Sequence, residues 1–578
     1  MKARGKGPFV LGIDFGTLSA RALLVDAGSG AEIATAEHEY GDGVLDELLP
    51  GDTRKLPPDS ALQNPADYVA ALKATIPKVL RESGVNAEHV AAIGTDFTSC
   101  TMLPVQADGT PLCFAPKWRR NPHAWAKLWK HHAAQPEANR IMEIGRQRNE
   151  PFLRAYGGRY SSEWFFSKLL ETVHQAPAVY AEAARFLEAG DWMTWQLCGA
   201  EKRSLSAAGF KAMWVYPARH DGGPASATGN SHDPGNAPRW TFPGRDFFRA
   251  LHPKLENVVA EKLGSELLPP GAKAGGLTKE MAKLTGLREG TPVAVGNIDA
   301  HAAVPACGVT IPGKLVMILG TSTCHLLVGD ARTEVEGMCG VVADGVIPGY
   351  WGYEAGQAGV GDLFSWYVEH GTPGALQAEA AKANQSVYEL LEKRAATLRP
   401  GASGLLALDW WSGCRSVLMD SDLSGLLLGM TLKTKPHEIY RALLEATGFG
   451  TRKIIDAFAT KGVPIDELYA CGGLAQKSPL LLQIYADITE RPIQVAASTQ
   501  TCALGAAMHA ALAAGLYPDM HEAAERMVRP SRHTYHPNRK EKAVYDQLHA
   551  EYNRLHDFFG RGAHSTMKAL KRIRQSRG

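Results

Sequence analysis

The sequence contains no CxxC pair, no apolar run of membrane-spanning length and no marked excess of either charge. Its 9 cysteines are odd in number and scattered, which argues against a disulfide framework and a zinc site and favours a reducing cytoplasm. The N-terminal stretch reaches Asp14 before a signal-length apolar core develops, and Ala503 to Leu516 is too short to cross a bilayer. The formal net charge of +2 gives no global field toward nucleic acid or an anionic membrane. We therefore expect a cytoplasmic protein with a small-molecule partner.

Two hairpin patterns organise a chain whose 578 residues suggest roughly two to four folding units. In each, two short apolar strands flank a turn that begins with glycine and continues with hydroxyl side chains. The first comprises Phe9 to Gly16 and Ala20 to Asp26; the second comprises Leu315 to Leu319 and Cys324 to Val328 around Gly320 to Thr323. The repetition predicts an internal duplication.

A third unit has the pattern of a strand, a glycine turn, a helix and a strand, covering Leu468 to Ala496. Helical spacing of apolar residues recurs in Asn64 to Leu80, Asn121 to Ala134, Ser162 to His174, Pro436 to Phe458 and Thr501 to Leu516. Strands that alternate with helices predict an α/β fold with a parallel or mixed sheet.

Two segments have no predicted place in the core. The stretch Asp221 to Pro238 is rich in glycine, proline and small polar residues, which is typical of a surface loop or insertion. After Glu541 a polar helical pattern ends in a basic tail, expected to be solvated, that contains Lys568, Lys571, Arg572, Arg574 and Arg577.

The first hairpin turn carries residues that suit a metal-bound phosphate chain. Asp14 can hold Mg²⁺ directly or through water, while Thr17, Ser19 and Arg21 can donate to phosphate oxygens. An ordinary hairpin with a turn aspartate is the alternative for this motif alone.

The second turn, Gly320, Thr321 and Ser322, has hydroxyls without an acid. Gly472 and Gly473, with Ser478 near the following helix, mark a place where backbone can approach a bulky group such as an adenosine, although a helix-packing turn would look the same. Three glycine turns in this order predict a nucleotide cleft between duplicated domains.

Asp299 follows a strand-like run and stands at the predicted start of a helix. An acid in this position can reach into a cleft and accept a proton from an attacking hydroxyl. Its alternative role is that of a helix N-cap, for which aspartate is a preferred residue.

These residues together resemble the FGGY carbohydrate kinases, which belong to the actin, Hsp70 and hexokinase-like superfold. The segment Gly425 to Glu445 follows the family's second signature, although Leu443 is atypical there, and SSEWFFSKLL at Ser161 to Leu170 replaces the first. The resemblance implies two duplicated actin-like (ribonuclease H-like) domains with mixed sheets, helices on their faces and an ATP and sugar cleft between them. It implies a sugar-binding domain at 1–305, a nucleotide-binding domain at 306–535 and a helical basic tail at 536–578.

Five segments resemble more closely the branch of this family that phosphorylates L-ribulose at its 5-hydroxyl in arabinose catabolism. They are SSEWFFSK, Gly94 to Val105, Ala208 to Trp214, Gly296 to Val309 and Gly352 to Gln357. This implies that Asp299 is the catalytic base and that Lys211 and Glu354 contact the sugar. The alternatives are a surface lysine and a surface acid. Asp96 matches a family strand end and would orient the site or cap a turn.

The same resemblance implies ATP and Mg²⁺ as cofactors, with Asp14 and Asp299 beside the metal. It assigns the nucleotide side to Thr17, Ser19, Arg21, Gly320, Thr321, Ser322, Gly472, Gly473 and Ser478, the last standing where relatives carry Asn. Glu163 and Trp164 would line the sugar pocket or only pack beside it. The expected partners are a sugar and ATP, with no nucleic acid or membrane; a homodimer is compatible with the sequence. The alternatives are a kinase for D-ribulose, xylulose or ribitol and a non-catalytic, ATP-switched actin-like protein.

Overall fold

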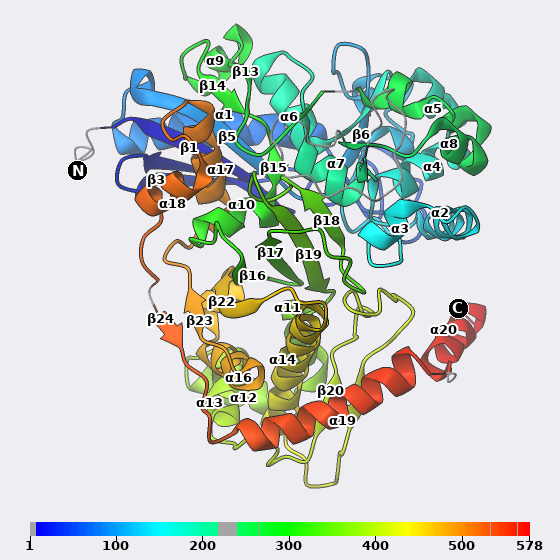
Figure 1. The fold of residues 1–578 in the computed structure, drawn as a ribbon, viewed down its shortest axis with the longest axis vertical. Coiled ribbons are helices and arrows are strands. Elements are labelled where there is room, and N and C mark those ends of the chain that lie inside the picture. Colours follow the sequence, from blue (N-terminus) through cyan, green and yellow to red (C-terminus); the bar gives the residue numbers. More distant parts are fainter. Residues whose placement is uncertain (1–6, 218–239, 265, 532, 563–564, 578) are drawn as a thin grey trace.

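The computed structural model describes residues 7–217, 240–264, 266–531, 533–562 and 565–577, and it contains two large mixed sheets, each with helices on its faces (Figure 1). The first sheet has the order β13-β14-β5-β1-β2-β3, with β15 beside β5. Its strands are β1 (Phe9–Phe15), β2 (Ser19–Asp26), β3 (Ala31–Glu39), β5 (Val90–Phe97), β13 (Lys273–Gly276), β14 (Pro292–Ala294) and β15 (Asn297–Ile298).

The second sheet has the order β18-β19-β17-β16-β22-β23-β24. Its strands are β16 (Gly313–Leu319), β17 (Thr323–Gly329), β18 (Gly340–Ala343), β19 (Trp351–Gln357), β22 (Ile465–Cys471), β23 (Ile493–Val495) and β24 (His533–Tyr535). A smaller sheet contains β4 (Leu62–Gln63), β7 (Ala126–Lys127), β6 (Met102–Val105) and β8 (Arg185–Glu188).

The two large sheets repeat one strand order with one set of polarities. In the first, β1 pairs antiparallel with β2 and parallel with β5; in the second, β16 pairs antiparallel with β17 and parallel with β22. The next strand outward is parallel in both, as β14 beside β5 and β23 beside β22. The duplication and the α/β fold predicted from the two hairpins are therefore confirmed.

Four of the expected helices are present within a few residues of their predicted bounds: α1 (Pro65–Ser83), α4 (Phe165–Gln175), α14 (Pro436–Thr460) and α17 (Thr501–Ala513). Local chemistry sets the ends of α1, because the Asn64 side chain accepts from the Ala66 N–H and Gly84 ends the helix at a φ of 68°. The strand, glycine turn, helix and strand predicted near residue 470 are β22, α15 (Gly473–Lys477), α16 (Pro479–Thr489) and β23.

The described chain also has two short strand pairs, β9 (Arg203–Ser204) with β12 (Leu267–Leu268) and β10 (Tyr216–Pro217) with β11 (Trp240–Thr241). The remaining α-helices and two further short strands complete its helices and strands apart from short 3₁₀ and π turns. They are α2 (Gln135–Gln147), α3 (Pro151–Ala155), α5 (Pro177–Glu182), α6 (Ala189–Cys198), α7 (Leu205–Lys211), α8 (Arg245–Leu251), α9 (Lys279–Thr285), α10 (Asp299–Ala306), α11 (Gly361–Trp366), α12 (Gly374–Lys382), α13 (Val387–Ala395), α18 (Met520–Met527), α19 (Lys542–Gly560), α20 (Thr566–Arg577), β20 (Leu406–Leu408) and β21 (Leu426–Leu428). Among the described residues, no helix combines the length and apolarity that a membrane span requires. The loop expected at Asp221 to Pro238 lies outside the described residues.

The helix expected over Asn121 to Ala134 is wrong. This stretch forms a 3₁₀ turn at Pro122–Ala124, the short strand β7 and further turns. Its apolar spacing instead serves tertiary contacts, since the Trp125 indole donates to the Arg119 carbonyl at 3.0 Å and the Trp129 indole donates to Thr17 Oγ1 at 3.1 Å. The second bond ties this segment to the first hairpin turn.

Helix α17 comes late in the chain but covers the first sheet, as the orange helix among the blue strands in Figure 1. The close approach depends on glycine. A Cβ at Gly12 would lie 1.9 Å from the Ala503 carbonyl oxygen, and one at Gly94 would lie 2.1 Å from that of Ala506. The chain therefore returns to the first sheet within the segment 306–535.

The C-terminal helices pack rather than trail into solvent. Tyr545 and Tyr552 of α19 are buried, and the Tyr552 hydroxyl donates to Asp409 at 2.9 Å. The expectation of a solvated basic tail is wrong for two of its five basic residues, because Lys568 and Lys571 pair with acids of the β20–β21 loop. Arg572, Arg574 and Arg577 are exposed, as expected.

Candidate active site

A cavity of about 370 Å³ lies where both hairpin turns, the start of α10 and the β20–β21 loop meet. Nine residues singled out from the sequence line it: Thr17, Glu163, Trp164, Lys211, Asp299, Gly320, Thr321, Ser322 and Glu354. Seven others do not line it: Asp14, Ser19, Arg21, Asp96, Gly472, Gly473 and Ser478. The fold therefore brings together one turn from each half of the duplication, the carboxylate at position 299 and two further charged residues.

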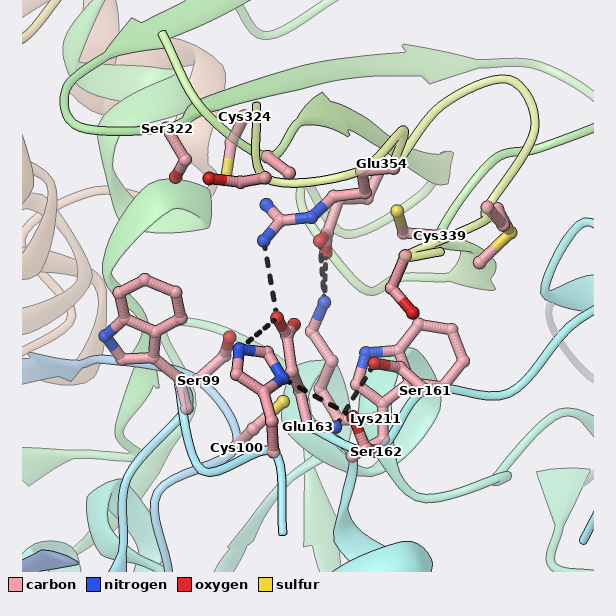
Figure 2. A pocket seen from close by; sticks show the side chains of 18 of the residues that line it. Ser99, Cys100, Ser161, Ser162, Glu163, Lys211, Ser322, Cys324, Cys339 and Glu354 are labelled. Atoms are coloured by element: carbon pink, nitrogen blue, oxygen red, sulfur yellow. Dashed lines mark hydrogen bonds and ion pairs between the residues drawn. The ribbon is translucent and has the colours of Figure 1, made fainter. Parts of the chain in front are cut away.

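A buried ion pair crosses this cavity between elements far apart in the chain (Figure 2). Lys211, the last residue of α7, donates through Nζ to both carboxylate oxygens of Glu354 on β19, at 2.6 and 2.8 Å. Both residues are buried, with relative exposures of 3% and 7%. Burial alone would raise the pKa of Glu354, but the charge of Lys211 and the contact with His301 outweigh it and lower the pKa to about 2. The pair is therefore fully charged at neutral pH.

The Lys211 ammonium keeps one donor for a ligand. An ammonium has three N–H bonds, and the hydrogen bonds that Lys211 makes within the described chain use two of them. Its nitrogen lies 5.8 Å from the centre of the Trp164 ring, which also lines the cavity. Burial lowers the pKa of Lys211, but the attraction of Glu354 is larger in sum and raises it, so the donor stays protonated. Lys211 can thus bind an oxygen-rich ligand while its own charge remains balanced.

His301 braces the same carboxylate from α10. Its Nε2 lies 3.1 Å from Glu354 Oε2 and its Nδ1 lies 2.8 Å from the Ser206 hydroxyl. The ring is fully buried, and burial lowers its pKa, so it is neutral at pH 7. A carboxylate can only accept, so the neutral ring donates from Nε2 to Glu354 and accepts the Ser206 hydroxyl at Nδ1. These two hydrogen bonds hold the ring between α7 and β19.

Asp299 is the first residue of α10 and lines the cavity, so its side chain does more than cap the helix. One carboxylate oxygen accepts from the Ala300 N–H at 2.7 Å, which leaves the other available to a ligand. Burial, followed by the nearby charge of Asp14, raises the pKa of Asp299 to about 7. A carboxylate with a pKa near the working pH suits general-base chemistry.

Asp14 and Asp96 lie opposite each other on the paired strands β1 and β5, near Asp299. Burial, and then the charges of Asp14 and Asp299, raise the pKa of Asp96 well above its ordinary value. Both carboxylate oxygens of Asp96 are buried without a hydrogen-bond partner among the described residues. Unsatisfied carboxylate oxygens beside two more carboxylates fit a divalent cation that also binds water and phosphate oxygens, as Mg²⁺ does. No group of three His, Cys, Asp or Glu side chains in the described chain is close enough to enclose a metal ion alone.

In the first turn, only Thr17 reaches the cavity. The Ser19 hydroxyl donates to Glu37 Oε1 at 2.8 Å, and Arg21 donates to the same oxygen at 2.7 Å. The Arg21 guanidinium also lies 3.6 Å from Asp14. Ser19 and Arg21 therefore lie behind the turn, where Arg21 balances Asp14; their direct contact with a phosphate stays a prediction.

The second turn is braced by the segment that follows β19. The N–H groups of Val360 and Asp362 both donate to the Thr321 carbonyl, at 2.8 and 3.1 Å, and the Gly320 N–H donates to the Ser322 carbonyl. Figure 2 shows Ser322 on the wall opposite Ser99. The Thr321 and Ser322 hydroxyls form no hydrogen bond with another described residue, which leaves them to donate into the cavity.

The third glycine turn lies behind the second one. Gly472 has a φ of 90°, and a Cβ there would lie 2.5 Å from the carbonyl oxygen of Leu319, the residue before Gly320. Ser478 caps α16 and donates to Glu392 at 3.0 Å, so its side chain is already engaged. Contact of Gly472, Gly473 and Ser478 with an adenosine stays a prediction.

Arg415 and His132 are among the cavity residues that the sequence did not assign to the site. Arg415 lies in the loop between β20 and β21, where no periodicity or motif marks it, and His132 lies in the stretch expected to be a helix. Glu163, named from the sequence only as a candidate, lies 3.6 Å from Arg415 and 3.9 Å from His132. The cavity therefore holds further charged pairs beside Lys211 and Glu354, namely Arg415 with Glu163 and Arg159 with Asp420.

Comparison with known proteins identifies the family to which this chain belongs. Residues 315–514 match the model of the C-terminal domain of the FGGY family of carbohydrate kinases. A ribulokinase of Geobacillus thermodenitrificans is 53% identical over 98% of this chain and 97% of its own, and one of Mycolicibacterium smegmatis is 45% identical over 100% and 98%. The chain belongs to the FGGY family of carbohydrate kinases. The membership expected from the sequence motifs is confirmed, and the protein is a sugar kinase.

Solved structures agree on the fold of this kinase. A ligand-bound xylulose kinase of Lactobacillus acidophilus has a TM-score of 0.74 at 17% identity, covering 95% of this chain and 98% of its own. A glycerol kinase of Plasmodium falciparum with ADP has a TM-score of 0.71 at 16% identity, covering 94% and 98%. At such identities these likenesses concern the fold alone, and they confirm the two-domain architecture expected from the sequence.

Proposed function

We propose that this kinase transfers the γ-phosphoryl group of ATP to the 5-hydroxyl of L-ribulose, giving L-ribulose 5-phosphate for arabinose catabolism in the cytoplasm. The observation that carries the proposal is the meeting, in one cavity, of Asp299, the Lys211–Glu354 pair and a hydroxyl-rich turn from each half of the duplication. The name ribulokinase, carried by relatives that are 45% and 53% identical over almost the whole chain, supports the choice of sugar.

Each residue has a defined part in this reaction. Asp299 accepts the proton of the attacking hydroxyl, for which its raised pKa is suited. The free donor of Lys211 and the oxygens of Glu354 hold sugar oxygens, because a pentulose offers only hydroxyls and a carbonyl. Thr17, Thr321 and Ser322 donate to phosphate oxygens from the two turns.

A magnesium ion would be held by Asp14, with Asp96 and Asp299 beside it, and when bound it would offset negative charge on the phosphates. Residues 1–305 would carry the sugar site and the base. Residues 306–535 would carry the nucleotide site, except that α17 belongs physically with the first sheet.

A coupled ADP-release assay across the four 2-ketopentoses and the pentitols tests the proposal. We expect the highest kcat/KM with L-ribulose and a product phosphorylated at C5. If another ketopentose or ribitol gave the highest kcat/KM, that sugar would replace L-ribulose as the proposed substrate. The absence of ADP release with every sugar would overturn the proposed reaction.

A further inference from the structure

Arg415 is a cavity residue with no settled partner. Its side chain is 20% exposed and lines the cavity, and its guanidinium carries five N–H donors. Within the described chain, the guanidinium forms an ion pair with Glu163 at 3.6 Å and donates no hydrogen bond. A distance of 3.6 Å exceeds the 2.7–3.2 Å of an N–H···O hydrogen bond. The donors of Arg415 are therefore available to a ligand.

The backbone holds Arg415 over β19 in a fixed place. The next residue, Ser416, donates through its N–H to the Gly356 carbonyl at 2.9 Å and accepts the Gly356 N–H on its hydroxyl at 3.1 Å. A Cβ at Gly356 would lie 3.4 Å from Arg415 Cδ and 3.6 Å from its Nη1. Since Gly356 and Glu354 are two residues apart on one strand, they share a face, and Arg415 lies beside the Lys211–Glu354 pair.

Glu163 lies just before α4 and lines the cavity as Arg415 does. Its side chain is 19% exposed, and its polar neighbours Arg415 at 3.6 Å and His132 at 3.9 Å are beyond hydrogen-bond distance. Two polar groups at this spacing can both bind one oxygen atom that lies beside the line joining them. A hydroxyl can donate to a carboxylate and accept from a guanidinium at once.

We propose that Arg415 and Glu163 are a second sugar-binding pair, bridged by a hydroxyl of the pentulose, so that the sugar itself joins the two walls of the cavity. The proposal rests on the sugar-kinase reaction given above and adds two contact residues to it. With Lys211 and Glu354, the pair places two cations and two carboxylates in the cavity beside the carboxyl group of Asp299, so sugar hydroxyls meet both donors and acceptors there.

Arg415→Gln and Glu163→Gln test this pair. Each should raise the KM for L-ribulose roughly 10- to 100-fold, the range for a hydrogen bond to a charged group, while the KM for ATP changes less than about twofold. Arg415→Lys keeps the charge without the planar fork and should recover part of the loss. Arg561→Gln, which removes a guanidinium that pairs with Glu336 at 2.7 Å and does not line the cavity, is the matched control and should leave both KM values unchanged.

Binding of deoxy sugars distinguishes direct contact between this pair and the sugar from a purely structural role of the pair. Mono-deoxy pentuloses that lack one hydroxyl each should identify a single position whose removal weakens binding to the unsubstituted kinase but not to Arg415→Gln, because both changes delete the same contact. Binding is followed without ATP through the fluorescence of Trp129 and Trp164, which line the cavity. Should either variant fold poorly, the remaining variant and Arg415→Lys carry the same test.

The outcomes separate the two proposals. If the unsubstituted kinase releases no ADP with any pentulose, the proposed function fails. If that kinase is active but the Arg415 and Glu163 variants keep a normal sugar KM, or if every deoxy analogue loses affinity equally on variant and unsubstituted kinase, then this pair does not bind the sugar.

Discussion

Two buried clusters in this kinase have the same composition and different uses. One, here called the cavity cluster, is Lys211, Glu354 and His301; the other, here called the scaffold cluster, is Lys127, Glu171 and His131. In the scaffold cluster, Lys127 Nζ donates to Glu171 at 2.5 Å, to the Thr172 hydroxyl at 2.8 Å and to the Lys168 carbonyl at 3.1 Å. Its three donors are used.

The scaffold cluster is also closed at its histidine. His131 Nδ1 accepts the Ala61 N–H at 3.2 Å, so Nε2 carries the proton and donates to Glu171 at 3.0 Å. Burial lowers the pKa of His131 to about 4, so the ring is neutral at pH 7. None of its three residues lines the cavity, whereas Lys211 and Glu354 of the cavity cluster do. The scaffold cluster, in which every donor of the lysine is used, therefore stabilises the fold. The cavity cluster keeps one donor of its lysine at the cavity, where that donor is available to a ligand.

The same contrast applies to two acids with equal pKa shifts. Burial raises the pKa of Asp299 and of Asp191 to about 7, but only Asp299 lines the cavity, and Asp191 accepts the Ser204 N–H at 2.7 Å inside the fold. Asp299→Asn should lower kcat about 10²- to 10⁴-fold, the usual worth of a general base. Asp191→Asn should leave kcat within about twofold. Steady-state kinetics of both variants check this prediction. Similar losses of kcat in the two variants would contradict the different roles assigned to Asp299 and Asp191.

Removing the scaffold lysine should act on stability instead. Lys127→Met leaves Glu171 buried without its cation, and breaking a buried pair in this way costs about 3–5 kcal/mol. We expect a large fall in the urea midpoint, with sugar and ATP KM values of the folded enzyme unchanged. Urea unfolding followed by circular dichroism measures the first effect; a midpoint equal to that of the unsubstituted kinase would argue that the cluster does not stabilise the fold.

The pH dependence follows from the raised pKa of Asp299. The base works only when deprotonated, so kcat/KM for the sugar should fall about tenfold for each pH unit below 7 and level off above it. For stability the sign is opposite: the folded state holds the proton more tightly than the unfolded chain, so this group's contribution is lost as pH rises from about 4 through 7. Asp299→Asn should therefore gain more Tm relative to the unsubstituted kinase at pH 8 than at pH 5. A flat pH profile in the unsubstituted kinase would contradict the assignment of the base.

The smallest effect is expected at the rim of the cavity. Lys568 of α20 pairs at 2.5 Å with Asp420, which lines the cavity and otherwise has Arg159 at 3.8 Å. Because Lys568 is partly exposed, Lys568→Ala should change the sugar KM by less than about fivefold. Adding 0.5 M salt should mimic the substitution, since salt screens exposed pairs. A loss as large as that of Arg415→Gln would mean that α20 is part of the sugar site.

The fold could be predicted where short segments carry their own signals. Apolar runs around a glycine turn define both hairpins, and their repetition predicts the duplicated sheets. The segment Asn121 to Ala134 could not be predicted, because its indole side chains are fixed by partners distant in sequence, such as Thr17. The packing of α17 on the first sheet depends likewise on Gly12, whose role becomes visible only when the helix lies against it.

The residues of the site also divide into those that could be predicted from the sequence and those that could not. Asp299, Lys211 and Glu354 could be predicted because they occupy segments that resemble a known family, and all three line the cavity. Arg415 could not, because it stands in an irregular loop and acquires its position from backbone bonds of its neighbour to β19. Apart from that resemblance, the sequence does not distinguish Lys127 from Lys211, since the number of used donors is a property of the folded chain.

Equilibrium binding of L-ribulose to Lys211→Met and Lys127→Met, followed by tryptophan fluorescence at a temperature where circular dichroism shows both folded, tests most directly whether the spare donor binds the sugar. Lys211→Met should raise the sugar Kd at least about tenfold, and Lys127→Met should leave it unchanged. Equal affinities in the two variants would contradict the claim that the ion pair across the cavity is the one that holds the substrate.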